Sequence, residues 1–329
     1  MSPKIMINNL SILIPTYNNV CLELVKDLQI QASLLSDFSY EILVADDGST
    51  DKMTVKENLT INDLENCRYI EREKNEGRAV IRNFLAKEAK YEWLLFIDSN
   101  MDIINSQYLS NYKMAEECDI LYGGYQIKKN QDSLKHNLRY IFECKGIQNG
   151  DYKLRQANPY GDFHTSNFII KRSIMLQYPL DERFRYYGYE DVLFGKTLKE
   201  NHINISHIDN PLGYNHFIGN MTFVTKTEES LRTLYQFRDE LQGYSKIITY
   251  ASKIERWHLK TICQKLFPVL SLPIKARLTG NNPNIFLFNI YKLMYYIHLN
   301  TLYGVTDIQN VGNNIGNEIF SNIHSPNHK

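Results

Sequence analysis

The sequence lacks the features that mark several large classes of protein. It has no excess of charge, because 37 Lys and Arg residues balance 37 Asp and Glu residues. A nucleic-acid-binding protein usually carries a clear basic excess, so nucleic acid is not expected as a partner. The five cysteines are scattered and form no Cys-x-x-Cys pair, which disfavours a zinc site or a disulfide framework. Reduced thiols in a cytoplasmic protein fit this pattern better.

Long apolar runs are also missing. No stretch is apolar over enough residues to span a bilayer, and the first apolar run, Leu10 to Ile14, is too short for a signal peptide. We therefore expect a cytoplasmic protein, and peripheral attachment to the inner face of the membrane stays open. No internal repeat is found, and the Asn-rich tail from Asn310 onward is expected to be mobile.

Common nucleotide-binding motifs are absent as well. A dinucleotide-dependent oxidoreductase needs Gly-x-Gly-x-x-Gly after its first strand, where this chain has Pro15-Thr16-Tyr17-Asn18. The nearest approach to a P-loop, Gly195-Lys196-Thr197, has Glu190 where the first glycine belongs. A nucleotidyltransferase would want a Gly-rich, basic loop after the first strand, and that loop is also missing. These three enzyme classes are therefore disfavoured.

What is present is an alternation of strand-like and helix-like segments. Short apolar runs predict strands at residues 10–14, 41–45, 67–70, 93–97, 119–122, 166–171 and 203–208. Helical patterns are found at residues 20–35, 78–90, 107–117 and 190–200, and residues 128–159 read as irregular or partly helical. This alternation predicts an α/β fold with a mostly parallel sheet flanked by helices on both faces.

Polar clusters follow three of the predicted strands. They are Pro15-Thr16-Tyr17-Asn18, Asp46-Asp47-Gly48-Ser49-Thr50-Asp51 and Asp98-Ser99-Asn100-Met101-Asp102. Ligands of parallel sheets bind at the carboxyl ends of the strands, so the three clusters are expected to converge. Carboxylates there can accept hydrogen bonds from a nucleoside, and Asp98 with a second oxygen ligand can hold a divalent cation against a diphosphate. The alternative for the two acidic clusters is ordinary turn and helix-cap chemistry.

Charged side chains also stand at the start of two predicted helices. Gly77 permits a tight entry to the first, where Arg78 or Arg82 could face phosphate or brace nearby carboxylates. The alternative is a capped surface helix on which at least one of these arginines is solvated. Glu190 and Asp191 open the second helix. A carboxylate can serve there as general base for an acceptor hydroxyl, although it also complements the positive end of a helix without any catalytic role.

Taken in order, these segments resemble the inverting family 2 glycosyltransferases with the GT-A fold. The matching elements are Ile14 to Asn18, Asp46 to Asp51, Asn75 to Asn83, Asp98 to Asn100, and Tyr189 to Asp191. The resemblance covers roughly the first two thirds of the chain, and several motifs in the right order are more specific than any one of them. It implies transfer of a sugar, with inversion, from a nucleotide sugar such as a UDP-sugar to a saccharide or lipid-linked acceptor.

The resemblance also implies a role for each matched position. The nucleotide-binding residues would be Pro15, Thr16, Tyr17, Asn18, Asp46, Asp47, Asn75, Gly77, Arg78, Arg82, Asp98 and Ser99. A divalent cation, Mn²⁺ or Mg²⁺, would be held by Asp98, Asn100, Asp102 and His216. Asp191 would be the catalytic base and Glu190 would contact the acceptor. The remaining sugar contacts would be Tyr187, Gly188, Tyr189 and His164.

One departure from the family pattern affects the cation. The usual Asp-x-Asp is here Asp98-Ser99-Asn100, and the neutral amide oxygen of Asn100 is a weaker ligand. Weaker cation binding, compensation by Asp102, and action without a metal are all left open. A nucleotide-sugar-binding protein without turnover is the alternative function that this departure suggests.

The C-terminal third has a different character. We place the GT-A domain at residues 1–224 and a helical region at residues 225–329. Between Lys246 and Lys292, eight basic residues stand against the single acidic residue Glu255, and apolar residues and Trp257 are interleaved with them. Such a segment suits an anionic membrane surface. Packing on the catalytic domain, or on a second copy in a homodimer, is the alternative.

Overall fold

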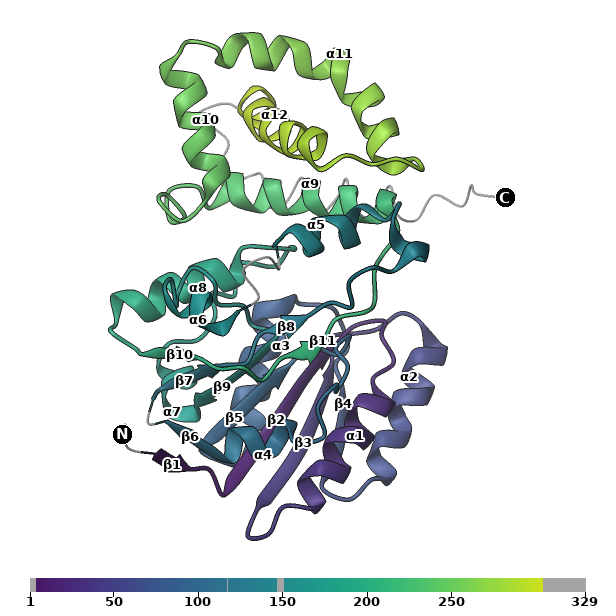
Figure 1. Cartoon of the computed structure of the whole chain (residues 1–329), viewed down its shortest axis with the longest axis vertical. Coiled ribbons are helices and arrows are strands. Elements are labelled where there is room, and N and C mark those ends of the chain that lie inside the picture. Colours follow the sequence, from purple (N-terminus) through teal and green to yellow (C-terminus); the bar gives the residue numbers. More distant parts are fainter. Residues whose placement is uncertain (1–3, 117, 147–150, 304–329) are drawn as a thin grey trace. The chain divides into compact units, whose positions relative to one another are not determined.

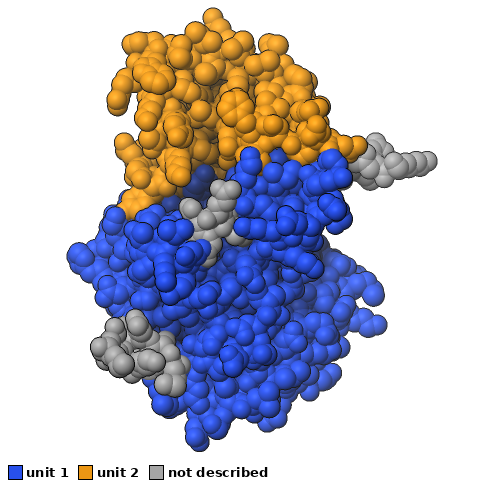
Figure 2. Space-filling model, in the orientation of Figure 1, with its two compact units in different colours: residues 1–219 blue, residues 220–329 orange. Residues whose placement is uncertain are grey.

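The computed structural model describes residues 4–116, 118–146 and 151–303, so the tail from Asn310 lies outside the described residues. The chain divides into two compact units, Met1–Gly219 and Asn220–Lys329, which Figure 2 shows in different colours. The division falls at the start of the first helix of the C-terminal region. Each unit has its own elements and its own packing.

A seven-stranded sheet forms the centre of unit 1 (Figure 1). Its strands, in spatial order, are β10 (Ile205–His207), β7 (Ile120–Tyr122), β9 (Asn167–Lys171), β5 (Trp93–Ile97), β2 (Asn9–Thr16), β3 (Ser39–Asp46) and β4 (Cys67–Glu71). All neighbouring pairs are parallel except those of β9, which runs antiparallel to both β5 and β7. The predicted mostly parallel sheet is confirmed.

Helices cover both faces of this sheet. The α-helices described in unit 1 are α1 (Leu22–Ser33), α2 (Lys52–Leu59), α3 (Arg78–Glu88), α4 (Tyr108–Lys113), α5 (Leu138–Gly146), α6 (Tyr152–Gln156), α7 (Arg172–Gln177) and α8 (Glu190–Glu200). Successive side chains of a strand point to opposite faces. Ile12 and Ile14 of β2 therefore pack with Leu28 of α1, whereas Leu13 packs with Leu85 of α3 on the other face.

The predicted helix at residues 107–117 is wrong at its C-terminal end. Helix α4 stops at Lys113, and Met114–Glu116 form strand β6, which pairs antiparallel with β1 (Lys4–Met6). The backbone N–H of Ile7 continues this contact by donating to the carbonyl of Lys113 at 2.9 Å. A partner more than a hundred residues away in the chain overrides the local helical pattern.

Unit 2 is helical, as predicted. It contains α9 (Asn220–Gln236), α10 (Lys246–Arg256), α11 (Lys260–Thr279) and α12 (Ile285–Tyr303). Aromatic contacts join α12 to its neighbours: Phe223 of α9 lies 5.3 Å from Phe288, and Phe267 of α11 lies 5.7 Å from Tyr291, between ring centroids. Among the described residues, no helix has the length and apolarity needed to cross a membrane.

Candidate functional site

The loops after β2, β3 and β5 are tied together by side-chain amides. The Oδ1 atom of Asn18 accepts the backbone N–H groups of Thr50 and Asp51, each at 2.9 Å. The Nδ2 atom of Asn19 donates to the carbonyl oxygen of Ser99 at 2.9 Å. The structure therefore brings the three predicted polar clusters to one edge of the sheet. Tyr17, at the same edge, keeps 45% of its surface exposed.

Asp46 and Asp47 both accept hydrogen bonds from backbone N–H groups of the surrounding loops. Asp46 is buried, and it accepts hydrogen bonds from the backbone N–H of Ser49 at 2.7 Å and from the Tyr69 hydroxyl. Asp47 accepts the backbone N–H of Gly77 at 2.9 Å and an Arg72 N–H at 3.0 Å. Burial raises the pKa of Asp47, and these donors only partly oppose the rise. Asp47 thus fixes the loop that leads into α3.

Gly77 allows the segment before α8 to pass close to the start of α3. Its φ of +101° lies in a region that side-chain-bearing residues rarely adopt, and a Cβ atom there would lie 2.8 Å from the carbonyl oxygen of Arg185. The segment before α8 therefore runs directly against the N-terminus of α3. Residues distant in sequence, Arg78 and Glu190, meet as a consequence.

Two arginines of α3 connect the acidic residues of the site. Arg78 forms an ion pair with Glu190, 2.7 Å from Nε to Oε1, and with Asp98, 3.3 Å from Nη2 to Oδ2. Arg82 is buried and pairs with the other oxygen of Asp98. The guanidinium of Arg78 also lies 5.6 Å from the ring centroid of Tyr187. Arg78 thus bridges the loop after β5 and the N-terminus of α8.

Glu190 is buried, and its Oε2 atom has no hydrogen-bond partner among the described residues. Burial raises the pKa of Glu190, and the charge of Arg78 opposes this rise without cancelling it. A buried carboxylate oxygen without a partner is costly unless a ligand supplies a donor. Glu190 therefore offers a free acceptor position at the start of α8.

Asp191 is paired with His164. The Nδ1 atom of His164 lies 2.9 Å from Oδ2 of Asp191, and the backbone N–H of Val192 donates to Oδ1 at 2.8 Å. Burial alone would raise the pKa of Asp191, but the hydrogen bond and charge of His164 lower it below its usual value. Burial alone would lower the pKa of His164, but Asp191 raises it. The pair therefore favours an ionised carboxylate beside an imidazolium.

The turn into α8 is strained. Gly188 and Tyr189 have φ values of +97° and +70°, two consecutive residues in left-handed conformations. Such a conformation is unfavourable for tyrosine and persists only where the surrounding structure enforces it. It orients the first turn of α8, which carries Glu190 and Asp191.

A second acidic position lies beside a histidine. Asp102 forms reciprocal backbone hydrogen bonds with Gly213, at 2.9 and 2.8 Å. This pairing places His216 with its Nε2 atom 3.4 Å from Oδ1 of Asp102, while Asn215 donates to Oδ2 at 2.8 Å. A carboxylate with an imidazole suits Mn²⁺ and similar cations. The structure thus brings two of the four predicted ligands together, whereas Asp98 is engaged by arginines.

The donor set is incomplete for a metal centre within the protein alone. Across the described part of the chain, no three His, Cys, Asp or Glu side chains cluster closely enough to hold an ion. Asn100 is half-buried and Asn75 is exposed. A cation at Asp102 and His216 would therefore need further ligands, and the oxygens of a bound diphosphate are of the right type.

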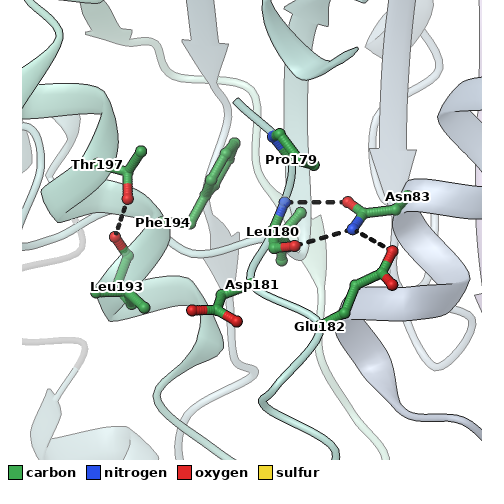
Figure 3. A pocket seen from close by; sticks show the side chains of 8 residues that line it. All are labelled: Asn83, Pro179, Leu180, Asp181, Glu182, Leu193, Phe194 and Thr197. Atoms are coloured by element: carbon green, nitrogen blue, oxygen red, sulfur yellow. Dashed lines mark hydrogen bonds between the residues drawn. The ribbon is translucent and has the colours of Figure 1, made fainter. Parts of the chain in front are cut away.

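A pocket of about 400 Å³ lies elsewhere on unit 1 (Figure 3). Its lining residues are Asn83, Pro179, Leu180, Asp181, Glu182, Leu193, Phe194 and Thr197. The Asn83 side chain closes one side, donating to the carbonyl of Leu180 at 2.9 Å and to Glu182 at 3.0 Å. None of the predicted site residues lines this pocket, so it is distinct from the candidate site.

Comparison with known proteins decides the family. The model of glycosyl transferase family 2 matches residues 11–178, which is half of the chain. The chain belongs to this family. The matched range contains the loops after β2, β3 and β5 and the start of α3, but it ends before Glu190, Asp191 and His216.

Two curated proteins that are similar to this chain carry the name uncharacterized glycosyltransferase. The protein from Rickettsia felis is 29% identical over 128 residues, and that from Rickettsia conorii is 29% identical over 129 residues. These matches cover 38% and 39% of this chain. They cover 20% of each relative, so the chain aligns with only about a fifth of their length.

Among solved structures, the family 2 chain is similar to the mannosyltransferase PcManGT from Pyrobaculum calidifontis, in complex with GDP-mannose and Mn²⁺. The TM-score is 0.54 at 13% identity, over 91% of this chain and 87% of that one. At this identity the likeness shows the fold alone. The predicted GT-A fold is confirmed.

Sequence reasoning missed one residue of the site. Arg72 binds both Asp47 and Glu76, and its guanidinium lies 5.2 Å from the centroid of the Phe84 ring. It comes directly after β4, at the same edge of the sheet as the three predicted clusters. Ligands of parallel sheets bind at the carboxyl ends of the strands, and this rule applied to β4 points to Arg72.

Proposed function

We propose that this chain transfers a hexosyl or N-acetylhexosaminyl group from a nucleoside diphosphate sugar, with UDP as the expected nucleotide, to a hydroxyl of a saccharide or lipid-linked acceptor. The transfer inverts the anomeric centre and serves glycan or polysaccharide biosynthesis. The catalytic domain comprises residues 1–224. The observation that carries the proposal is the bridge through Arg78, which holds Asp98 beside Glu190 and therefore close to Asp191.

The donor would bind along the edge formed by the loops after β2, β3 and β5. Tyr17 offers an exposed ring on which the base can stack. Arg78, with two-fifths of its side chain exposed, offers positive charge to the diphosphate beside Asp98. Asp46 and Asp47 support this site by holding the loops that surround it.

A divalent cation fits beside the donor at Asp102 and His216. When bound, it would neutralise negative charge on the departing diphosphate. The two side chains meet because the backbone of Asp102 pairs with Gly213, three residues before His216. Asn215 orients the carboxylate through its hydrogen bond to Oδ2.

The residues at the start of α8 would handle the acceptor. Asp191 takes the proton of the acceptor hydroxyl as that oxygen attacks the anomeric carbon. The bond from this carbon to the diphosphate oxygen breaks in the same step, and the nucleoside diphosphate leaves with the bonding electrons. His164 holds Asp191 in the ionised, proton-accepting form. The unpartnered Oε2 of Glu190 can accept a hydrogen bond from a second acceptor hydroxyl.

The direct test is a screen of nucleotide sugars for release of nucleoside diphosphate, with and without Mn²⁺. We expect one sugar nucleotide to be hydrolysed slowly alone and faster with a suitable acceptor. Binding of a nucleotide sugar without any turnover would favour the alternative, a nucleotide-sugar-binding protein. That alternative is motivated by Asn100 in place of the family's second aspartate.

Replacing His216 with alanine should raise the Mn²⁺ concentration for half-maximal activity at least about tenfold, because the cation loses an imidazole ligand. Titration of activity with Mn²⁺ measures this change, and calorimetry of Mn²⁺ binding in the presence of nucleoside diphosphate gives a readout without turnover. An unchanged Mn²⁺ requirement would exclude His216 as a ligand.

Replacing His164 with glutamine should move the acidic limb of the pH–activity profile to higher pH. Asp191 must be ionised to act as base, so activity is lost as pH falls through its pKa. His164 lowers that pKa, and without the imidazolium the effect of burial raises it. We also expect about a tenfold loss at the optimum from the poorer hydrogen bond. An acidic limb that does not move would contradict the pairing's role.

A further inference from the structure

Two helices of unit 2 bury few of their own residues. Helix α10 buries none of its residues, and α11 buries only Phe267 and Leu278. Within the unit, α12 lies inside the frame that α9, α10 and α11 form (Figure 1). Phe267 packs on Tyr291 of α12, which defines the inner side of α11. The outer side of α10 and α11 is therefore available for another purpose.

This outer side of α11 carries an apolar stripe. Its members are Ile262, Leu266 and Val269 on the helix and Leu259 directly before it, all of them exposed. They recur at intervals of three and four residues, so they share one side of the helix. Trp257, which is 67% exposed, directly precedes the stripe, and Tyr250 on α10 is also exposed. Large apolar side chains gathered on one exposed face usually mark a binding surface.

The same two helices are strongly basic, although the whole chain is neutral. Seven Lys and Arg residues lie between Lys246 and Arg277, and Glu255 is the single acidic residue in that range. Glu255 is paired with Lys260, 2.6 Å away. The exposed basic residues of the two helices are Lys246, Lys253, Arg256, Lys265 and Arg277.

We propose that this surface, made of the apolar stripe, Trp257 and the exposed basic residues of α10 and α11, binds the surface of a membrane that contains anionic lipids. A basic amphipathic helix with a tryptophan lies in the interface with its apolar side chains in the acyl boundary and its cations at the headgroups. The charge decides against a second copy of this chain, whose identical face would bring like charges together. This inference does not depend on the proposed transferase activity.

The two prolines within α11 agree with an interfacial position. Pro268 and Pro273 each remove the amide hydrogen that a helix would donate to the carbonyl four residues earlier. At the surface of a membrane, water can satisfy the carbonyls that lose this donor. The helix is thus suited to lie on a membrane.

Flotation of the full chain with vesicles tests the proposal. The protein should float with vesicles of phosphatidylcholine and phosphatidylglycerol, weakly with phosphatidylcholine alone, and less at high salt. The double variant Lys253→Glu with Arg256→Glu should lower partitioning at least about tenfold, since each basic residue near an anionic surface contributes about a fivefold effect. Leu266→Glu with Val269→Glu should abolish flotation. Leu34→Glu, on a leucine of unit 1 that is more exposed than either of these two residues, should leave it unchanged.

A second measurement locates the contact. The emission of Trp257, obtained by difference from the Trp257→Phe variant, should shift to shorter wavelength and resist iodide quenching when anionic vesicles are added. Equal binding to neutral and anionic vesicles, or flotation without this shift, would overturn the proposal. A dimer in the absence of lipid that Leu266→Glu with Val269→Glu dissociates would also overturn it, in favour of a second copy. Circular dichroism should show that these exposed substitutions leave the helices folded.

Discussion

Replacing Asp191 with asparagine should lower the turnover number about a thousandfold, the effect expected when a general base is removed. Asparagine has nearly the same size and can still hydrogen-bond to His164 and to the backbone of Val192, so the turn should keep its shape. Affinity for the nucleoside diphosphate should stay the same, because Asp191 acts on the acceptor. Turnover kinetics and calorimetry of nucleotide binding measure the two quantities separately.

The control for this substitution is Asp181→Asn. Asp181 is also an ion-paired aspartate of unit 1, 2.6 Å from Arg183, but it lines the separate pocket of Figure 3. Its replacement should leave turnover unchanged. If Asp191→Asn weakened nucleotide binding as much as turnover, Asp191 would be a support of the nucleotide site and the assigned base would be wrong.

Replacing Gly77 with alanine should have the second large effect. The new Cβ would lie 2.8 Å from the Arg185 carbonyl, in a backbone conformation that favours glycine. We expect a loss of about 2 kcal/mol in the free energy of unfolding. We also expect about a hundredfold loss of activity, because a shift of Arg78 by about 1 Å disturbs its bridge between Asp98 and Glu190. Urea unfolding and donor hydrolysis measure the two losses.

Gly243→Ala is the control that separates the effect of the steric clash at Gly77 from the effect of backbone strain. Gly243 also has a positive φ, +84°, but a Cβ there would meet no atom within 4 Å. This variant should lose stability from backbone strain and keep its activity. If Gly77→Ala kept full activity as well, the close approach of the segment before α8 to α3 would not be needed for function.

Apolar runs and helical periodicity predicted the strands and helices whose formation depends mainly on residues nearby in the sequence. The apolar run at residues 93–97 and the helical pattern at residues 190–200 coincide with β5 and α8. The helix prediction for residues 114–116 is wrong because these residues form a strand that pairs with β1, a segment distant in the sequence. The reversed direction of β9 likewise follows from where the chain returns to the sheet, which periodicity does not encode.

The candidate site shows the same difference between what the local sequence predicts and what the packing of distant segments decides. Motif order pointed to Asp98, Glu190 and Asp191, but it could not show that Arg78 joins the first two. The pairing of Asp191 with His164 joins residues on different segments, and so does that of Asp102 with His216. Such pairs are decided by how the loops pack. The charge of a neighbour, rather than residue type, then sets which way the pKa of Asp191 moves.

The structure of the chain with nucleoside diphosphate and Mn²⁺ bound would test the central claim most directly. The account predicts the diphosphate between Arg78 and the Asp102–His216 pair, with the base against Tyr17. A nucleotide bound instead in the pocket beside Asn83 and Phe194, or on any surface remote from Arg78, would contradict it.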